Sequence, residues 1–223
     1  MTEVVDRLLA LEVSAVCDAD KGLPVVDPAI RAMVLDVRMA GPAFTLLAPD
    51  DHLPVFGALA EAAPGDVLVI SSGEGSVAVL GELFATEARR RGLAGVVVDG
   101  FCRDVAGLRQ LGLPVFARGT IPRSGSTVAR PALGAPVRCG GVEVRPGDIV
   151  FGDDDGVAVA PAERFAAALE VAETIGRSER AMLEAMRADR ATLHDLTNWA
   201  EHVAALDSGE QSSLRFEVDA GAG

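Results

Sequence analysis

The chain has 223 residues, of which 49% are hydrophobic, and 33 acidic residues against 20 Lys and Arg give it a formal net charge of −13. A chain of that length can bury a full apolar core without disulfides or metal sites to stabilise it. The negative charge argues against binding to nucleic acid or to an anionic membrane surface, since both would be repelled. No apolar run approaches the roughly 18 residues of a membrane span, and no signal-peptide pattern opens the sequence. Three cysteines without paired spacing predict neither disulfides nor a zinc site, so we expect a cytoplasmic protein.

The first part of the chain alternates helical and extended patterns. Residues 3–20 are predicted to form one helix, because apolar residues recur there at helical spacing. Strands are expected at 33–38 and 43–47, separated by a Gly-Pro break, and a short helix at 52–62. The continuous apolar run at 67–70 is typical of a strand that is buried on both faces.

A βαβ unit is the clearest local pattern. It consists of the strand at 67–70, a helix at 80–91 ended by Gly92, and a second buried strand at 93–99. A short helix at 105–111 and a short strand at 114–117 follow. The fold class is therefore α/β.

The last third changes character twice. Residues 137–159 are predicted to form a meander of strands and turns, and residues from 161 onward are predicted to be mainly helical. We expect a core domain at 1–160, a helical oligomerisation arm at 161–206 and a loose tail at 207–223. A separate helical domain is the alternative to an arm. The first apolar stripe of the arm contains Phe165, Leu169 and Ile175, which we expect to be buried against a neighbouring subunit.

Two segments carry the candidate chemistry: Gly81–Thr86, which reads as a Gly-led helix start, and the strand and turn that end in Arg103 and Asp104. A helix N-terminus offers free N–H groups to a carboxylate, and Arg offers a planar fork to the same ligand. Asp104 and Glu82 add hard oxygen ligands suited to Mg²⁺ or Mn²⁺. This combination predicts an enzyme that acts on small 2-oxo acids.

Other motifs favour ordinary structural roles. The Gly73–Gly75 segment lacks the third glycine of a dinucleotide fingerprint, and the acidic segment Gly152–Gly156 is interpreted as a solvated β-turn rather than a calcium loop. His52, His194 and His202 are scattered, and we interpret them as surface or helix-face residues.

An ordered set of motifs resembles the RraA-like family, which includes class II 4-hydroxy-4-methyl-2-oxoglutarate aldolases and the regulator of ribonuclease activity A. The resemblance covers roughly residues 4–200. It implies a swivelling β/β/α domain assembled as a trimer or hexamer, with active sites at subunit interfaces. The motifs are Gly81–Ala85, Gly92–Gly100, Arg103-Asp104, Pro114–Gly119 and Gly147–Val157.

The resemblance also implies roles for single residues. Asp104 would bind Mg²⁺ or Mn²⁺ directly, and Arg103 would clamp the carboxylate and keto oxygens of the substrate. The family typically has Asp where this chain has Glu82, which would hold the metal ion through water. Glu179 from a neighbouring subunit would also hold the ion through water, and the alternative for Glu179 is a solvated carboxylate. The backbone N–H groups around Gly81, Leu83 and Phe84 would complete the binding site of the substrate carboxylate.

Two functions follow from this resemblance. The first is a metal-dependent lyase that cleaves a 4-hydroxy-2-oxo acid to pyruvate and also decarboxylates oxaloacetate. The second is a non-catalytic regulator that binds ribonuclease E through its acidic surface. Arg103, Asp104 and Asp99 favour the enzyme, whereas Glu82 in place of Asp keeps the regulator open. The second carbonyl product is not specified by the sequence.

Overall fold

The structure, a computed structural model, describes residues 1–73 and 75–216. Two compact units are present, Met1–Ala172 and a second that starts at Glu173. The first unit ends inside a helix rather than at the predicted residue 160, because the first turns of that helix pack into its core. Glu74 of the glycine-containing loop and the predicted tail from 217 onward lie outside the described residues. The predicted oligomerisation role of the helical segment stays a prediction.

The first unit is built on one large mixed sheet. Its strands run in the order β1-β6-β5-β3-β2-β10-β11, with β4 added beside β5 and β7 beside β2. β2, β3, β5 and β6 are parallel, and β3 pairs with β5 in register as the predicted βαβ unit requires. The strands are β1 (Arg31–Ala32), β2 (Met39–Leu47), β3 (Val67–Ser71), β4 (Ala78–Leu80), β5 (Gly95–Cys102), β6 (Val115–Thr120), β7 (Ala132–Leu133), β10 (Ile149–Asp153) and β11 (Gly156–Ala160).

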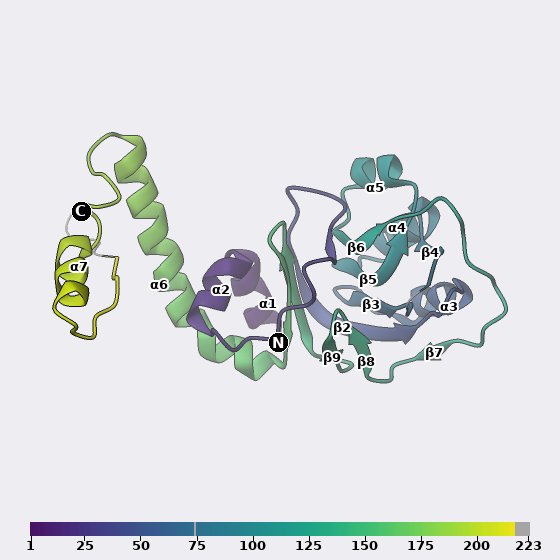
Figure 1. The fold of residues 1–223 in the computed structure, drawn as a ribbon. Helices are drawn as coiled ribbons and strands as arrows, with labels where there is room; N and C mark the ends of the chain where they lie inside the picture. Colours follow the sequence, from purple (N-terminus) through teal and green to yellow (C-terminus); the bar gives the residue numbers. More distant parts are fainter. Residues whose placement is uncertain (74, 217–223) are drawn as a thin grey trace. The chain divides into compact units, whose positions relative to one another are not determined.

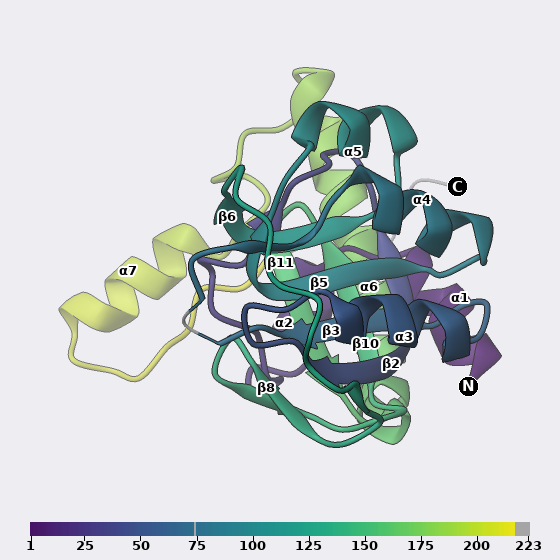
Figure 2. The same cartoon turned by 90° about the vertical axis from the view of Figure 1, so that its right-hand side faces the viewer.

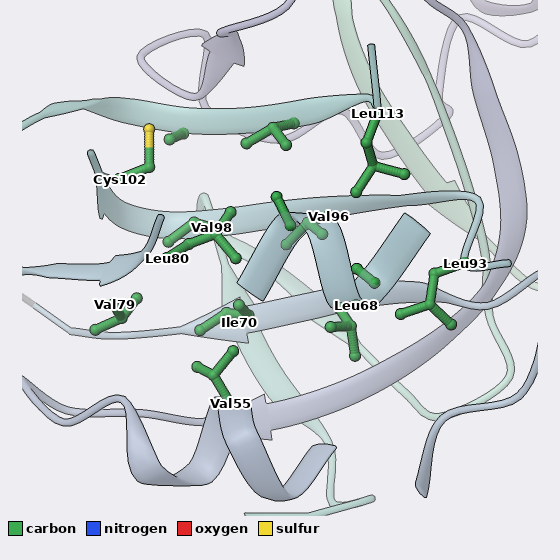
Figure 3. Packing of buried hydrophobic residues seen from close by; sticks show 14 of the residues in the cluster. Val55, Leu68, Ile70, Val79, Leu80, Leu93, Val96, Val98, Cys102 and Leu113 are labelled. Carbon is green, nitrogen blue, oxygen red and sulfur yellow. The ribbon is translucent and has the colours of Figure 1, made fainter. Parts of the chain in front are cut away.

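Helices α3 (Leu53–Glu61), α4 (Glu82–Arg90) and α5 (Val105–Leu111) group on one side of this sheet, as Figures 1 and 2 show. Their apolar sides meet alternate residues of the central strands, so that Val55 of α3 lies beside Ile70 of β3 (Figure 3). The other face of the same strands packs on β10, β11 and a separate hairpin of two strands. These strands are β8 (Val137–Cys139) and β9 (Val142–Val144). The layers confirm the predicted β/β/α class.

The N-terminal helix differs from its prediction. Residues 3–20 form two helices, α1 (Thr2–Leu9) and α2 (Val13–Ala19), rather than one. The break is stabilised from outside, because the Val13 N–H at the start of α2 donates a 2.9 Å hydrogen bond to Oδ2 of Asp153. A local apolar period cannot reveal such a distant partner.

The strand predictions around residue 40 were partly wrong. Residues 33–38 form bends and irregular backbone instead of a strand, and Asp36 adopts a positive φ of 60° that a strand does not allow. The expected Gly-Pro break lies inside β2, which pairs with β10 before residue 43 and with β3 from Ala43 onward. Gly41 permits a close backbone approach, since a Cβ there would collide with the carbonyl oxygen of Gly65.

The meander at 137–159 is two hairpins rather than one continuous run, because β8–β9 forms its own sheet and β10–β11 extends the main one. The acidic segment 152–156 contains the β10–β11 turn, which is exposed at Asp154 and Asp155 as predicted, but Asp153 is buried at the end of β10 and pairs with Gly156. Oδ1 of Asp153 accepts the N–H of Asp155, which stabilises the turn.

The helical prediction after residue 161 is confirmed by α6 (Ala162–Arg187) and α7 (Trp199–Asp207). The interpretation of the first stripe was wrong in part, because Phe165 and Leu169 are at most 1% exposed. They pack in the core of their own unit, where Phe165 makes an edge contact with Phe151 at 6.3 Å between ring centroids. These two side chains are therefore unavailable to a neighbouring subunit. None of the helices in the described ranges is long and apolar enough to cross a membrane.

Candidate functional site

The turn that follows β5 presents Arg103 and Asp104. The Arg103 N–H donates to the carbonyl of Leu80 at 2.9 Å, which ties the end of β5 to β4. Asp104 then adopts a left-handed conformation, with φ 59° and ψ 39°, and its carbonyl accepts the Leu108 N–H at the start of α5. A non-glycine residue in this region is uncommon, and such residues gather at functional sites.

The carboxylate of Asp104 does not cap its own helix. Oδ2 instead accepts the backbone N–H of Glu82 at 3.3 Å, and it lies 3.4 Å from Nε of Arg103. Both side chains remain substantially exposed, at 40% for Arg103 and 44% for Asp104. Gly81 makes this approach possible, because a Cβ there would lie 2.6 Å from Oδ2 of Asp104. The structure thus brings together Gly81, Glu82, Arg103 and Asp104, as the sequence analysis expected.

A cavity of about 140 Å³ opens beside this cluster, and its wall includes Leu83 and Phe84 of α4. Gly81 offers no side chain to cap α4, and Asp104 accepts only the N–H of Glu82, so the next N–H groups, those of Leu83 and Phe84, are left for a ligand or for water. A helix N-terminus and a guanidinium beside one cavity can hold a carboxylate by short charge-assisted hydrogen bonds.

His52 also lines this cavity, and the sequence analysis missed it. Its ring lies 5.6 Å from that of Phe84, centroid to centroid, and the backbone N–H of His52 donates to the carbonyl of Ser126. The residue directly precedes α3, and nothing in its local pattern connects it with α4 or with the turn after β5. The only available signal was its place at a loop-to-helix boundary, which many unremarkable residues share.

Asp51, the residue before His52, fixes the loop behind it. Asp51 is 1% exposed. Burial opposes the charge on its carboxylate, but hydrogen bonds from the Ser126 hydroxyl and from the N–H groups of Val128, Ala129 and Leu53 outweigh that effect. The pKa of Asp51 is therefore held well below its usual range. An ionised Asp51 holds the His52 segment on the 126–129 loop.

Asp99, which the sequence analysis counted in favour of an enzyme, has a structural partner. Its Oδ1 lies 2.5 Å from Nε of Arg118, and its Oδ2 accepts the Gly140 N–H at 2.8 Å. Arg118 also contacts Asp27 at 2.9 Å, and the hydrogen bonds that it donates to Asp27 and to Asp99 outweigh burial and raise the pKa of the guanidinium. Asp99 does not line the cavity of Arg103.

The metal ligands predicted from the sequence are partly brought together. Asp104 and Glu82 lie on adjoining elements, and within residues 1–73 and 75–216 no cluster of three His, Cys, Asp or Glu side chains forms. Mg²⁺ keeps several of its waters and is commonly bound through one or two carboxylates, so this donor set fits that ion better than Zn²⁺. Glu179 is exposed on α6 in the second unit, and its role stays a prediction.

Comparison with known proteins identifies the family of the chain. The family model described as RraA-like, Aldolase/RraA, matches residues 13–159. A Halalkalibacterium halodurans protein provisionally named 4-hydroxy-4-methyl-2-oxoglutarate aldolase is 35% identical over 161 residues, which are 71% of this chain and 77% of that protein.

Two solved structures are also similar. An uncharacterized Pseudomonas syringae protein has a TM-score of 0.75 at 27% identity, covering 86% of this chain and 95% of its own. Streptomyces coelicolor RraAS2, described as an unusual member of the RNase ES inhibitor RraA family, has a TM-score of 0.70 at 30% identity, covering 84% and 98%. The chain therefore belongs to the RraA-like family. That family contains proteins named as aldolases and proteins named as inhibitors of RNA processing.

Proposed function

We propose that this chain is a divalent-metal-dependent lyase that cleaves a 4-hydroxy-2-oxo acid of the 4-hydroxy-4-methyl-2-oxoglutarate type to pyruvate, and that it also decarboxylates oxaloacetate. The observation that carries the proposal is the cluster in which Asp104 contacts both the Glu82 N–H and Nε of Arg103 at the edge of a cavity. A protein-binding surface would not need a converging cation, carboxylate and free helix N–H groups.

The residues have separate roles in binding the substrate and the metal ion. Arg103 and the N–H groups of Leu83 and Phe84 bind the carboxylate and the keto oxygen of the substrate. Asp104 and Glu82 would hold Mg²⁺ or Mn²⁺, Glu82 through water, and the ion supplies electrostatic stabilisation of the charge that develops on the keto oxygen. Glu179 of a neighbouring subunit would contribute through water.

Aldol cleavage breaks the C3–C4 bond. Glu82 accepts the proton of the 4-hydroxyl through an intervening water while the electron pair of that bond passes to the keto side, giving the enolate of pyruvate and a second carbonyl compound. Glu82 then returns the proton through the same water to C3, which gives pyruvate. Oxaloacetate yields the same enolate by loss of CO₂, and Arg103 stabilises its charge in both reactions.

A regulator of ribonuclease E is the second candidate, favoured by the similarity to RraAS2, which is described as a member of an RNase inhibitor family, and by the net charge of −13. For either function we propose a homotrimer or hexamer. We also propose that the protein is cytoplasmic, because its three cysteines are free thiols, as expected in a reducing compartment.

The two functions are separated by one paired experiment. The chain with saturating Mg²⁺ is incubated with 4-hydroxy-4-methyl-2-oxoglutarate and with oxaloacetate, and pyruvate is measured. In a parallel arm, the same preparation is added to ribonuclease E and an RNA substrate. Catalytic release of pyruvate supports the lyase, whereas inhibition of RNA cleavage without pyruvate supports the regulator.

A further inference from the structure

Gly107, the third residue of α5, lies against the side chain of Glu82. A Cβ atom at Gly107 would come closer than 3.0 Å to Cδ and Oε2 of Glu82 and would lie 2.8 Å from its Cγ. These are the three heavy atoms nearest to that position. The space that this glycine leaves open is thus taken up by the carboxylate of one residue.

The backbone does not explain why position 107 is a glycine. Gly107 has no positive φ and lies within a regular helix, a conformation that any L residue adopts. Glycine is among the least favourable residues in a helix, so the seven-residue α5 alone would be better served by Ala. Close packing of the α4 and α5 backbones is also not the reason, because the nearest atoms belong to the far end of a flexible side chain.

The Glu82 carboxylate depends on this space for its position. Within the described part of the chain, no hydrogen bond or ion pair of that carboxylate is present, while the backbone N–H of the same residue is tied to Asp104. A flexible side chain without polar partners takes the rotamer that the surrounding volume allows. Gly81 makes room in the same way for Asp104, whose Oδ2 would lie 2.6 Å from a Cβ at that position.

We propose that Gly107 is a positioning residue: by lacking a side chain it seats the Glu82 carboxylate against the first turn of α5, next to the turn that carries Asp104. The extra methylene of a glutamate at position 82 is accommodated by this glycine. The effect on catalysis rests on the proposed lyase function, whereas the effect on the side-chain position does not. Gly107→Ala should move Glu82 while leaving the helix intact or more stable.

The test compares Gly107→Ala, Glu82→Ala and the double variant. Gly107→Ala should lower pyruvate release about 10- to 100-fold, the range typical for residues that orient a metal-associated group. Gly107→Ala should also raise the Mg²⁺ concentration at which half of the thermal stabilisation by Mg²⁺ is reached. The melting temperature of this variant without Mg²⁺ should not fall. In the Glu82→Ala background, adding Gly107→Ala should change neither the rate of pyruvate release nor the Mg²⁺ midpoint, because the side chain that it displaces is gone.

Three results would overturn the inference. One is normal turnover and a normal Mg²⁺ midpoint in Gly107→Ala when the wild type is active. Another is an equal loss in both backgrounds, which would mean that Gly107 acts independently of Glu82. The third is a crystal structure of Gly107→Ala in which Glu82 has not moved. That structure decides the matter even if the wild type releases no pyruvate, an outcome that would contradict the lyase proposal instead.

Discussion

The backbone N–H of Glu82 donates a 3.3 Å hydrogen bond to Oδ2 of Asp104, which joins the start of α4 to the residue that precedes α5. Twenty-two positions separate the two residues in sequence. Parallel pairing of β4 with β5 brings the ends of both strands to one edge of the sheet, where the helices begin. The site is therefore a product of the βαβ connection, and its chemistry depends on a few side chains at that edge.

Replacement of Arg103 distinguishes an anion clamp from a structural ion pair. The planar guanidinium can hold a carboxylate with two parallel hydrogen bonds, which Lys cannot do. We expect Arg103→Ala to lower oxaloacetate turnover about 10²- to 10³-fold, as for loss of one preorganised donor, and Arg103→Lys to do nearly as much harm. Steady-state kinetics and thermal melts on both variants check this.

The melting temperature of both variants should stay close to that of the wild type. A partly exposed pair such as Arg103 and Asp104, 40% and 44% exposed, is worth only about 0–1 kcal/mol. Near-normal turnover in Arg103→Lys would remove Arg103 from the catalytic residues.

Asp99 should affect stability rather than catalysis. Removing its carboxylate leaves the Gly140 N–H without its acceptor and Arg118 with Asp27 alone, and we expect Asp99→Ala to lower the free energy of unfolding by about 1–3 kcal/mol. Denaturant unfolding measures this loss, and turnover at a temperature well below the melting point should be retained. A folded Asp99→Ala variant that has lost turnover would assign Asp99 a role in the site.

The ionised carboxylate of Asp51 should make the folded protein less stable in acid. Its pKa is lower in the folded protein than in the unfolded chain, so the stability that it contributes is fully present above the unfolded value of about 3.9. That contribution is lost as the pH falls below this value toward the folded pKa. Melting temperatures measured from pH 7 to pH 2 should show Asp51→Asn melting lower than the wild type at neutral pH, with a difference that narrows in acid. A constant difference across this range would argue against the ionised carboxylate as the anchor.

Oligomerisation is expected through the apolar surface beside the cavity rather than through the buried stripe of α6. Leu83 is 82% exposed and Phe56 is 64% exposed, and Phe56 lies near Phe84 with 6.4 Å between ring centroids. Exposed apolar surface of this kind is commonly covered by a second copy of the chain. Light scattering at micromolar concentration should give the mass of a trimer or hexamer, and a monomeric mass would contradict this.

Most of the fold could be predicted from local patterns. The buried run at β3, the α4 helix with Gly92 after it, and α5 were predicted from features contained in a dozen residues each. The wrong predictions share a different cause. The division of the first helix depends on Asp153, and the course of β2 through Pro42 depends on pairing with β10, both more than a hundred residues away.

The candidate site shows the same division. Gly81, Glu82, Arg103 and Asp104 could be predicted because an ordered motif carries them. His52 and Gly107 could not, since the importance of each is visible only in contacts with Phe84 and Glu82 on another element. The ion pair of Asp99 could not be predicted for a similar reason, as its partner Arg118 follows on the neighbouring strand.

Removal and return of the metal tests the central claim most directly. Pyruvate release from oxaloacetate is measured with the wild type and with Asp104→Asn, first with Mg²⁺, then after exhaustive treatment with EDTA, and again after Mg²⁺ is restored. Because Asp104 and Glu82 offer oxygen ligands suited to a hard cation, the wild type should lose its activity with EDTA and regain it with Mg²⁺ or Mn²⁺, and Asp104→Asn should be inactive throughout. Full activity of the EDTA-treated wild type would contradict the account.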